Sequence, residues 1–531
     1  MKFYDCNEAD TKLVQARIDD FVPKQVFDAH AHLFNREHFV AENLYPMLKP
    51  MTVMGIDDYH KAAGAWLPNR TVEGLFFGFP NKGNDRAAVN RWMVEQIRKC
   101  GGTNSRVLAL TSPDDKPEAV VAQIKELGMV GVKPYHVYSS LKDTGQATIE
   151  EFVPEWMWDI CNSMNGVLTL HIVKPRAIAD KDNQADIRRL CYKYPKCRLV
   201  LAHVARSFCY RHAREGLGTL VDIDNVWVDM SAITETESIR SAIETLSPKR
   251  VLFGSDYPVT QLRGRCVAVG DGFYWIYPET ANLDTAIPKK SETLIAVESL
   301  LCLREACEDT GLNEGDIQDI FRNNALRLLA PHLKQTEVPK QSSGPELWTE
   351  AWKRVSGGTG LLSKRAELYD PKSWPSYFSK CLGSDVWDAT GRRFVDFTGG
   401  VGAVLLGYAD PDVTRAVKRR LNLGSHSTLC TPDEVELADI LLELHPWAGR
   451  IRYARGGGEA LGVAVRIARA ATGKSGIAFC GYHGWQDWYL AANLGDDSSL
   501  DGHLLPGTLF HAIGGDLPLV LTLAVAFILP R

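Results

Sequence analysis

The stretch QVFDAHAHL, residues 25–33, decides the expected fold of the N-terminal region and carries its strongest chemical motif. The apolar residues Val26 and Phe27 precede Asp28, after which alanine alternates with histidine. Side chains two positions apart lie on the same face of a strand. If this stretch is a strand, His30 and His32 therefore point toward the same side, where their imidazoles can meet a common partner.

Seven further short apolar runs follow this stretch, with amphipathic segments between them. They are VEGLFFGFP (from Val72), RVLAL (from Arg106), MVGVKPYHV (from Met129), VLTLHIV (from Val167), RLVLAHV (from Arg198), VWVDMSAI (from Val226) and RVLFGSDYPV (from Arg250). Most are continuously hydrophobic, which is typical of parallel strands buried on both faces. Eight such repeats predict an α/β fold, a (β/α)8 TIM barrel, with a doubly wound sheet as the alternative.

Polar residues stand where several of these runs end, which favours the barrel. His171 ends the fifth run, His203 the sixth and Asp256 the eighth. Chemistry in a barrel belongs at the C-terminal ends of its strands. An isolated H-x-H motif is a weak signal, and each polar residue by itself is more often a hydrogen-bonded group of the core. Because all five fall at corresponding strand ends, we expect a metal site, for which imidazole and carboxylate ligands suit Zn²⁺, Mn²⁺ or Fe²⁺.

The N-terminal region resembles the amidohydrolase superfamily, in its amidohydrolase-2 branch. The resemblance covers roughly residues 25–332 and rests on DAHAHL, on GSDYP in the eighth run and on FRNNALRLL, residues 321–329. It implies that the ligands of one divalent ion, Zn²⁺ before Mn²⁺, are His30, His32, His171 and Asp256. It also implies that His203 orients or protonates the substrate and that Asp256 accepts a proton from the attacking water.

These residues suit hydrolysis of a C–N or C–O bond in a small carbonyl compound through a water that the metal activates. The same branch contains non-oxidative decarboxylases with a very similar site, and the metal ligands alone do not separate the two reactions.

Two further basic residues are candidates for roles at this site. Lys133 lies in the fourth run, where some members of the superfamily carbamylate a lysine to bridge two metals; a lysine that binds a substrate carboxylate or pairs with a nearby acid is the favoured alternative, with one metal ion. Arg206, three residues after His203, is either an anion clamp or a solvated loop residue.

The composition changes after the barrel pattern ends. We expect the barrel over residues 1–332, a linker over 333–350, where Pro, Ser, Gly and charged residues replace apolar periodicity, and a second domain over 351–531. In this second domain an entry with glycine turns precedes amphipathic helices. An apolar strand from Ile451 is expected to lead into three consecutive glycines and a further helix.

The second domain resembles class III aminotransferases of the glutamate-semialdehyde aminomutase kind over roughly residues 364–507. The resemblance implies a partial aspartate-aminotransferase-like α/β domain in which Gly456, Gly457 and Gly458 hold the phosphate of pyridoxal phosphate and Tyr482 stacks on its ring. Glycines before a helix expose backbone N–H groups, which suit a phosphate.

The family's cofactor-binding lysine has no counterpart here. Residues 508–531 form an apolar tail that does not match the family and contains no lysine. Without that amine the cofactor loses its covalent anchor, so transamination by this chain alone is not expected. We interpret the domain as the front part of an aminotransferase, truncated or ending in a shifted frame. The competing hypotheses are a domain that binds pyridoxal phosphate with help from another chain, and a barrel that serves only as a scaffold.

Composition and charge limit the kinds of molecule that the protein is expected to bind. The 531 residues carry a net charge of −5, which does not favour nucleic acid. The N-terminus lacks the apolar segment of a secretory signal, and the longest apolar run, 517–530, is shorter than the ~20 residues of a bilayer span. We therefore expect a cytoplasmic protein that acts on a small molecule without a membrane partner, with a homo-oligomer as an open option.

Overall fold

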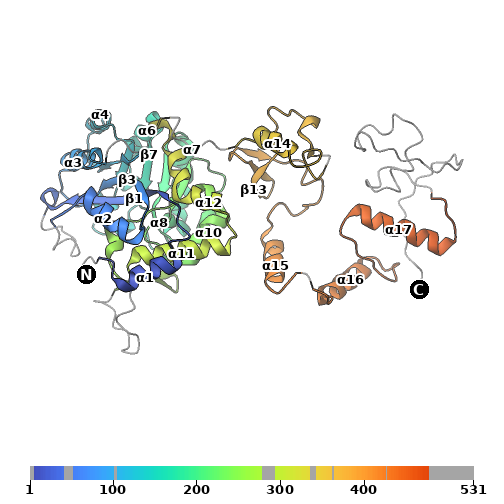
Figure 1. Cartoon of the computed structure of the whole chain (residues 1–531). Helices are drawn as coiled ribbons and strands as arrows, with labels where there is room; N and C mark the ends of the chain where they lie inside the picture. The colour runs from blue at the N-terminus through green and yellow to red at the C-terminus, as the bar shows by residue number, and fades with distance from the viewer. Residues whose placement is uncertain are drawn as a thin grey trace. The chain divides into compact units, whose positions relative to one another are not determined.

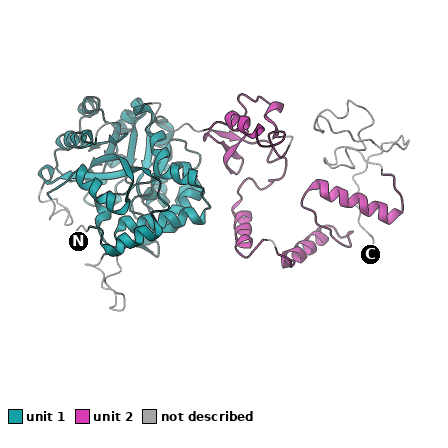
Figure 2. Ribbon diagram, in the orientation of Figure 1, with its two compact units in different colours: residues 1–340 teal, residues 341–531 magenta. Residues whose placement is uncertain are grey.

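The computed structural model describes residues 5–40, 52–100, 104–277, 293–334, 342–361, 364–425 and 427–477. The chain divides into two compact units, residues 1–340 and residues 341–531 (Figure 2). The first unit holds the predicted barrel, and the second holds the region that resembles an aminotransferase.

All eight apolar runs of the first unit form parallel strands, which confirms the predicted barrel. The strands are β1 (Gln25–Asn35), β3 (Thr71–Gly78), β4 (Arg106–Val107), β5 (Ala109–Thr111), β6 (Gly131–Pro134), β7 (Val167–Leu170), β8 (Arg198–Leu201), β9 (Val226–Asp229) and β10 (Val251–Leu252). The third run is divided at Leu108 into β4 and β5.

The strands close into a ring through two junctions. They form a sheet of order β2-β1-β3-β4 and a sheet of order β10-β9-β8-β7-β6-β5, where β2 (Val53–Met54) is a short antiparallel addition to β1. At one side the two sheets meet at β4 and β5, the two halves of the third run, which follow each other in the chain. At the other side the Ala29 amide donates to the Phe253 carbonyl at 2.8 Å, and Ala31 pairs with Tyr257. The last strand is thereby placed beside the first.

Helices follow most of the strands, and most of the helices lie on the outside of the ring (Figure 1). They are α1 (Glu8–Arg17), α2 (Ile56–Trp66), α3 (Arg86–Arg98), α4 (Pro117–Leu127), α5 (Ile149–Phe152), α6 (Glu155–Met164), α7 (Lys181–Lys193), α8 (Ala202–Arg206), α9 (Tyr210–Gly216), α10 (Thr236–Leu246), α11 (Ile295–Asp309), α12 (Glu314–Gln318) and α13 (Asn324–Leu328). A hairpin of β11 (Arg265–Val269) and β12 (Gly272–Ile276), which the sequence analysis did not predict, follows the eighth strand.

One end of the barrel interior is filled by apolar side chains. Residues from the strands, including Phe27, Leu75 and Val200, cluster with Ala325 and Leu326 of α13. The Arg198 guanidinium, at the start of β8, donates to the carbonyls of Arg327 and Leu328 on α13, at 2.9 and 2.5 Å. The FRNNALRLL motif thus closes the end at which the strands begin, which leaves chemistry to the opposite end.

The described residues of the second unit form a small sheet and four α-helices. The strands are β13 (Phe378–Leu382), β14 (Asp385–Asp388) and β15 (Arg393–Val395), and the helices are α14 (Gly344–Trp352), α15 (Pro411–Asn422), α16 (Pro432–Leu444) and α17 (Gly457–Thr472). The antiparallel sheet matches the predicted entry with glycine turns.

Two details of the second unit differ from expectation. Helix α14 begins within the stretch predicted as a linker, because Ser343 and Glu346 form a capping box that starts a helix there. Residues 451–454, expected as a strand, carry no strand structure, and no strand among the described residues pairs with them.

The helices of the second unit expose apolar side chains. Neither α15 nor α16 has a buried residue, and Leu421, Ile440 and Leu444 are all more than half exposed. Most of a helix's stability in a protein comes from packing of its apolar face. In the part of the chain that the structure describes, no helix is both long and apolar enough to cross a membrane.

Candidate metal centre

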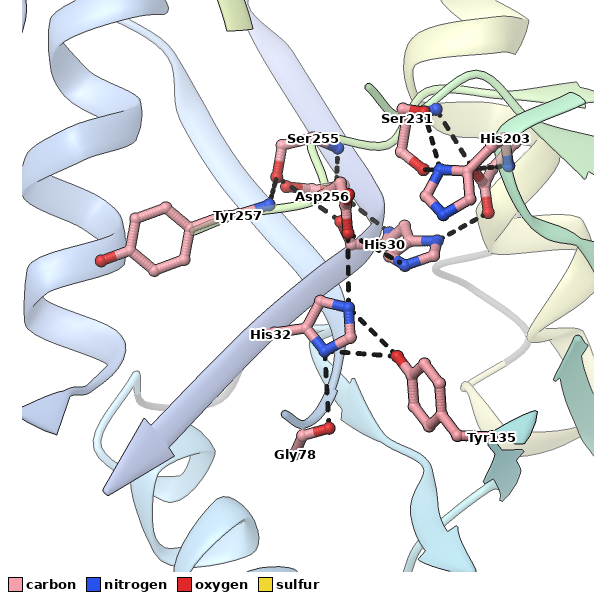
Figure 3. Close-up of polar contacts among 11 residues, drawn as sticks. His30, His32, Gly78, Tyr135, His203, Ser231, Ser255, Asp256 and Tyr257 are labelled. Carbon is pink, nitrogen blue, oxygen red and sulfur yellow. Dashed lines mark hydrogen bonds and ion pairs between the residues drawn. The ribbon is translucent and has the colours of Figure 1, made fainter. Parts of the chain in front are cut away.

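The histidines of the DAHAHL motif lie on β1 and meet the aspartate that follows β10. The ring centroids of His30 and His32 are 5.3 Å apart, as expected for side chains on one face of the strand. Both rings point at the Asp256 carboxylate (Figure 3). Gly254 permits this approach, because a Cβ at that position would come within 2.9 Å of the His30 side chain.

The spacing of the ligand atoms fits one metal ion. The Oδ1 atom of Asp256 is 3.4 Å from Nε2 of His30 and 3.3 Å from Nε2 of His32. Two ligands bound at about 2.1 Å to one tetrahedral ion lie about 3.4 Å apart. Ligand atoms of His30, His203 and Asp256 all fall within 4.8 Å of one another. The donor set therefore fits a divalent ion.

The protonation states of these groups also suit a metal. Burial lowers the pKa of His30, His32 and His203, so each imidazole is neutral and keeps a lone pair. Burial alone would raise the pKa of Asp256, but the neighbouring imidazoles, His32 first, outweigh burial and hold the pKa below its ordinary value. The carboxylate is thus charged and ready to bind a cation.

His32 has polar neighbours besides Asp256. The Tyr135 hydroxyl lies 3.1 Å from Nε2 of His32. The Gly78 carbonyl lies 3.4 Å from Nδ1 of the same ring (Figure 3). These contacts fix the ring on the side of the centre that faces β6.

His203 enters the centre from the turn after β8. Its Nδ1 lies 2.8 Å from the Ser231 carbonyl and 3.0 Å from the Ser231 hydroxyl. A proton on Nδ1, donated to that carbonyl, leaves Nε2 free to face the centre. Because Ser231 fixes the tautomer and the ring plane, His203 is well placed either to bind an ion or to exchange a proton with a substrate.

His171 stands at the edge of the group. Its ring centroid is 5.1 Å from that of His203, in a T-shaped contact. Its Nδ1 is buried and has no hydrogen-bond partner among the described residues. Burial, followed by the charges of neighbouring basic groups, holds its pKa well below the ordinary value. The structure therefore brings all five predicted residues together, with His32 and His171 outside the set of three whose ligand atoms all lie within 4.8 Å of one another.

Asp229, at the end of β9, contacts the candidate site and was missed by the sequence analysis. Its Oδ2 accepts a hydrogen bond from Nδ1 of His30 at 2.9 Å, which turns Nε2 of His30 toward Asp256. Its Oδ1 also accepts from the His203 amide at 3.0 Å. The sequence offered a clue to Asp229, because the run VWVD ends in a polar residue at the C-terminal end of its strand, as the runs that carry the other site residues do.

Asp229→Asn is expected to weaken metal binding by about 10- to 100-fold while leaving the fold intact. An amide can still contact Nδ1 of His30 but no longer supports the ring with a negative charge. Metal affinity measured by competition with a chelator checks this result. Asp159→Asn, at an exposed position on α6, is the matched control. Equal affinity in both variants would show that Asp229 plays no part in ion binding.

Asp28 of the same motif ties the two sides of the centre together. Its Oδ1 accepts from the His30 and Ser255 amides at 3.0 and 2.8 Å, and its Oδ2 accepts from the Tyr59 hydroxyl at 2.8 Å. Burial raises the pKa of this carboxyl to about 6. Asp28 thus fixes the segment that carries Asp256 against β1.

Lys133 on β6 is a buried amine beside the centre. Its Nζ has no hydrogen-bond partner among the described residues and lies 4.4 Å from the Tyr135 ring centroid and 5.1 Å from the Phe77 ring centroid. Burial lowers its pKa to about 7, although the charges of Asp229 and Asp256 act in the opposite direction. A direct hydrogen-bonded pair with an acid, one of the alternatives considered for this lysine, is not formed within the described residues.

Lys133→Met is expected to stabilise the metal-free protein. The unfolded chain takes up a proton at Lys133 near pH 10.5, whereas the folded chain does so only near pH 7. The free energy of unfolding of the wild-type protein therefore decreases as the pH falls from 10.5 toward 7. Each unit of pKa difference corresponds to about 1.4 kcal/mol. In urea unfolding, the variant should have a free energy of unfolding several kcal/mol higher than wild type at pH 7 and nearly the same as wild type near pH 11. Lys125→Met, at an exposed position on α4, should show no such pH-dependent gain; a gain equal at both pH values would contradict the argument.

The predicted phosphate-binding glycines lie at the start of α17. Gly456 is its N-cap, and a Cβ at Gly456 or Gly457 would meet nothing within 4 Å. The Glu459 carboxylate in the first turn accepts from the Arg455 amide at 3.0 Å, so a negative charge already stands at this helix start. Tyr482 lies outside the described residues. The described part of this region therefore does not form an enclosure that fits pyridoxal phosphate.

Known proteins match the two regions separately. In the C-terminal region, a 2'-deamino-2'-hydroxyneamine transaminase of Streptomyces kanamyceticus is 38% identical over 120 residues, 22% of this chain and 31% of that protein. A glutamate-1-semialdehyde 2,1-aminomutase of Methanobrevibacter smithii is 35% identical over 147 residues, 27% of this chain and 34% of that protein. The chain thus spans about one third of the length of these curated relatives.

The structure of Amidohydrolase 2 from Bifidobacterium longum subsp. infantis covers 58% of this chain and 99% of its own, with 13% identity and a TM-score of 0.36. Residues 369–501 match the family model of the class-III aminotransferases. Residues 27–330, more than half of the sequence, match the amidohydrolase model, and the chain accordingly belongs to the amidohydrolase family.

Proposed function

We propose that the barrel is a metal-dependent hydrolase that cleaves a C–N or C–O bond of a small carbonyl compound. The observation that carries this proposal is the spacing of 3.3 and 3.4 Å between one Asp256 oxygen and two neutral imidazoles, all of them buried. Hydrogen bonds between such groups would be long and weak, whereas a shared cation explains the spacing. The family match supports the same class of reaction.

We assign His30, His32, His171 and Asp256 as the residues that hold the ion, Zn²⁺ first. A divalent ion bound there would lower the pKa of a water molecule and polarise a carbonyl group. Asp256 is ionised and stands within 3.4 Å of two ligand nitrogens, so its second oxygen is placed to accept a proton. His203, fixed through Nδ1 by Ser231, presents Nε2 as the group that orients the substrate and returns the proton to the leaving group.

Metal analysis combined with product analysis tests this proposal. Purified protein should contain close to one equivalent of Zn²⁺ or Mn²⁺ per chain, and a panel of lactones, amides and esters should include a substrate that is hydrolysed only by the metal-loaded protein. A decarboxylase of the same branch is the second candidate, because the same ligands serve both reactions. Release of CO₂ from one of a panel of aromatic carboxylic acids, with no hydrolysis in the first panel, would favour the decarboxylase. Protein that binds no divalent ion would overturn both.

The class-III aminotransferase match raises pyridoxal phosphate as a cofactor of the second region. We propose that this chain does not retain it, because the described residues around α17 leave the expected phosphate site open and already place a carboxylate there. Protein incubated with pyridoxal phosphate and dialysed should carry no bound cofactor, and Tyr482→Phe should leave the barrel's activity unchanged. One equivalent of retained cofactor would contradict this interpretation.

A further inference from the structure

Four consecutive residues of α8 adopt a left-handed backbone conformation. The φ angles of His203, Val204, Ala205 and Arg206 are 58°, 49°, 53° and 57°. L-residues avoid this region, and Val204 is β-branched, which makes it more costly still. Strained backbone of this kind is concentrated at functional sites. Because residues three apart lie on the same side of a helical turn, the strained turn brings Arg206 to the side on which His203 faces the metal centre.

Two aromatic rings, Phe273 and Phe208, connect the Arg206 side chain to His203. Its Nη1 donates to the Lys174 carbonyl at 2.9 Å, and its guanidinium carbon lies 5.4 Å from the Phe273 ring centroid on the hairpin. Phe273 lies 5.1 Å from Phe208, and Phe208 stacks on His203 at 5.3 Å. These contacts fix the position of the guanidinium, and among the described residues they leave most of its N–H groups without an acceptor.

Arg206 has no acidic partner within the described ranges. The acids that follow Lys174 along the chain are already used, because the Lys174 ammonium contacts Asp180 at 3.4 Å and Asp182 at 2.5 Å. Burial lowers the pKa of Arg206, and no acid acts against that effect. A partly buried cation is unfavourable without a counter-ion, and the described residues supply none, so this guanidinium is suited to binding an anion.

The neighbouring groups on this side are also basic. The His136 ring stacks on that of His171 at 5.8 Å. The charge of Arg206 acts on both of these rings, which places the guanidinium on this side of the centre. The carboxylates Asp229 and Asp256 lie on the side of His30.

We propose that the substrate carries a carboxylate besides its reacting group, and that the Arg206 guanidinium binds this carboxylate while the metal centre engages the reacting group. This inference rests on the proposed function and narrows it to a class of substrate. A guanidinium offers two parallel N–H donors that match a carboxylate, which a neutral amide cannot replace.

Binding of paired probes to the metal-loaded full-length protein tests the inference. Succinate, glutarate and adipate are each compared with their monoamides by calorimetry. In each pair one carboxylate is free to reach the ion, and only the second end differs. In the wild-type protein at least one dicarboxylate should bind about tenfold or more tightly than its monoamide, because the charge-assisted hydrogen bonds to Arg206 are lost in the amide. The range of lengths covers different separations between the two ends.

Variants of Arg206 separate recognition from structure. Arg206→Gln should remove the preference for the dicarboxylate, and Arg206→Lys should keep part of it because the charge remains. Arg211→Gln, which alters an exposed arginine that donates to the Gly270 carbonyl of the same hairpin, should keep the full preference. Metal content and melting temperature are measured for every variant.

Equal binding of the dicarboxylate and its monoamide by wild-type protein at all three lengths would overturn the carboxylate assignment even with one equivalent of metal bound. A preference that survives in folded, metal-loaded Arg206→Gln would overturn the role of Arg206. Failure of the wild-type protein to bind metal would instead overturn the proposed function, so the two failures are distinguishable.

Discussion

Replacing His30 or His171 with alanine is expected to remove both the metal and the hydrolytic activity that we propose for the barrel. Nε2 of His30 lies 3.4 Å from Asp256 Oδ1, within the tightest group of ligand atoms, and its ring is oriented by Asp229. Loss of one of four ligands from a site with a single ion is expected to lower metal affinity by several orders of magnitude and to leave no activity above background. Metal content after dialysis and turnover of the same samples measure both effects.

His60→Ala is the matched control for this prediction. His60 is exposed on α2 and belongs to no group of ligand atoms among the described residues. It should keep one equivalent of metal and full turnover. Full metal content in His30→Ala would show that the motif on β1 does not bind the ion, whatever the activity of the variant.

Replacing His203 with asparagine has the second largest expected effect, and it acts on turnover without removing the ion. The ring is held through Nδ1 by the Ser231 carbonyl at 2.8 Å, which leaves Nε2 for proton exchange with the substrate. Loss of a positioned proton donor or acceptor lowers kcat by about 10²- to 10⁴-fold. Metal analysis should still find one equivalent, and KM should change less than kcat.

The pair His203→Asn and His171→Ala discriminates between two ligand sets. In the proposed set His171 binds the ion and His203 does not. If His203→Asn lost the metal and His171→Ala retained it, the ligands would instead include the compact trio of His30, His203 and Asp256. The roles of His171 and His203 would then be exchanged.

The barrel and most of its site were predictable because both have local signatures. Continuously apolar runs form strands when helices cover the sheet, and all eight did so. The spacing of two in DAHAHL fixed the common face of His30 and His32, and the polar ends of the other runs marked the edge of the ring. FRNNALRLL was recognised as a motif, and the structure shows its physical role in closing the opposite end.

Features that depend on distant backbone geometry were not predictable. Asp229 matters because a strand neighbouring His203 places it beside His30, and a single aspartate at a strand end does not reveal that contact. The left-handed turn of α8 violates local preference, so the segment from Ala202 to Arg206 gave no sign of it. In the second unit, amphipathic patterns correctly placed α15 and α16, but a pattern does not show whether an apolar face finds a partner to pack against.

A crystal structure of the metal-loaded protein, with anomalous data collected at the absorption edge of the bound metal, would show which side chains hold the ion. One anomalous peak is expected about 2.0–2.2 Å from His30 Nε2, His32 Nε2, a nitrogen of His171 and an oxygen of Asp256. A peak elsewhere, or ligand side chains around an ion that do not include the two histidines of β1, would contradict the proposed metal centre.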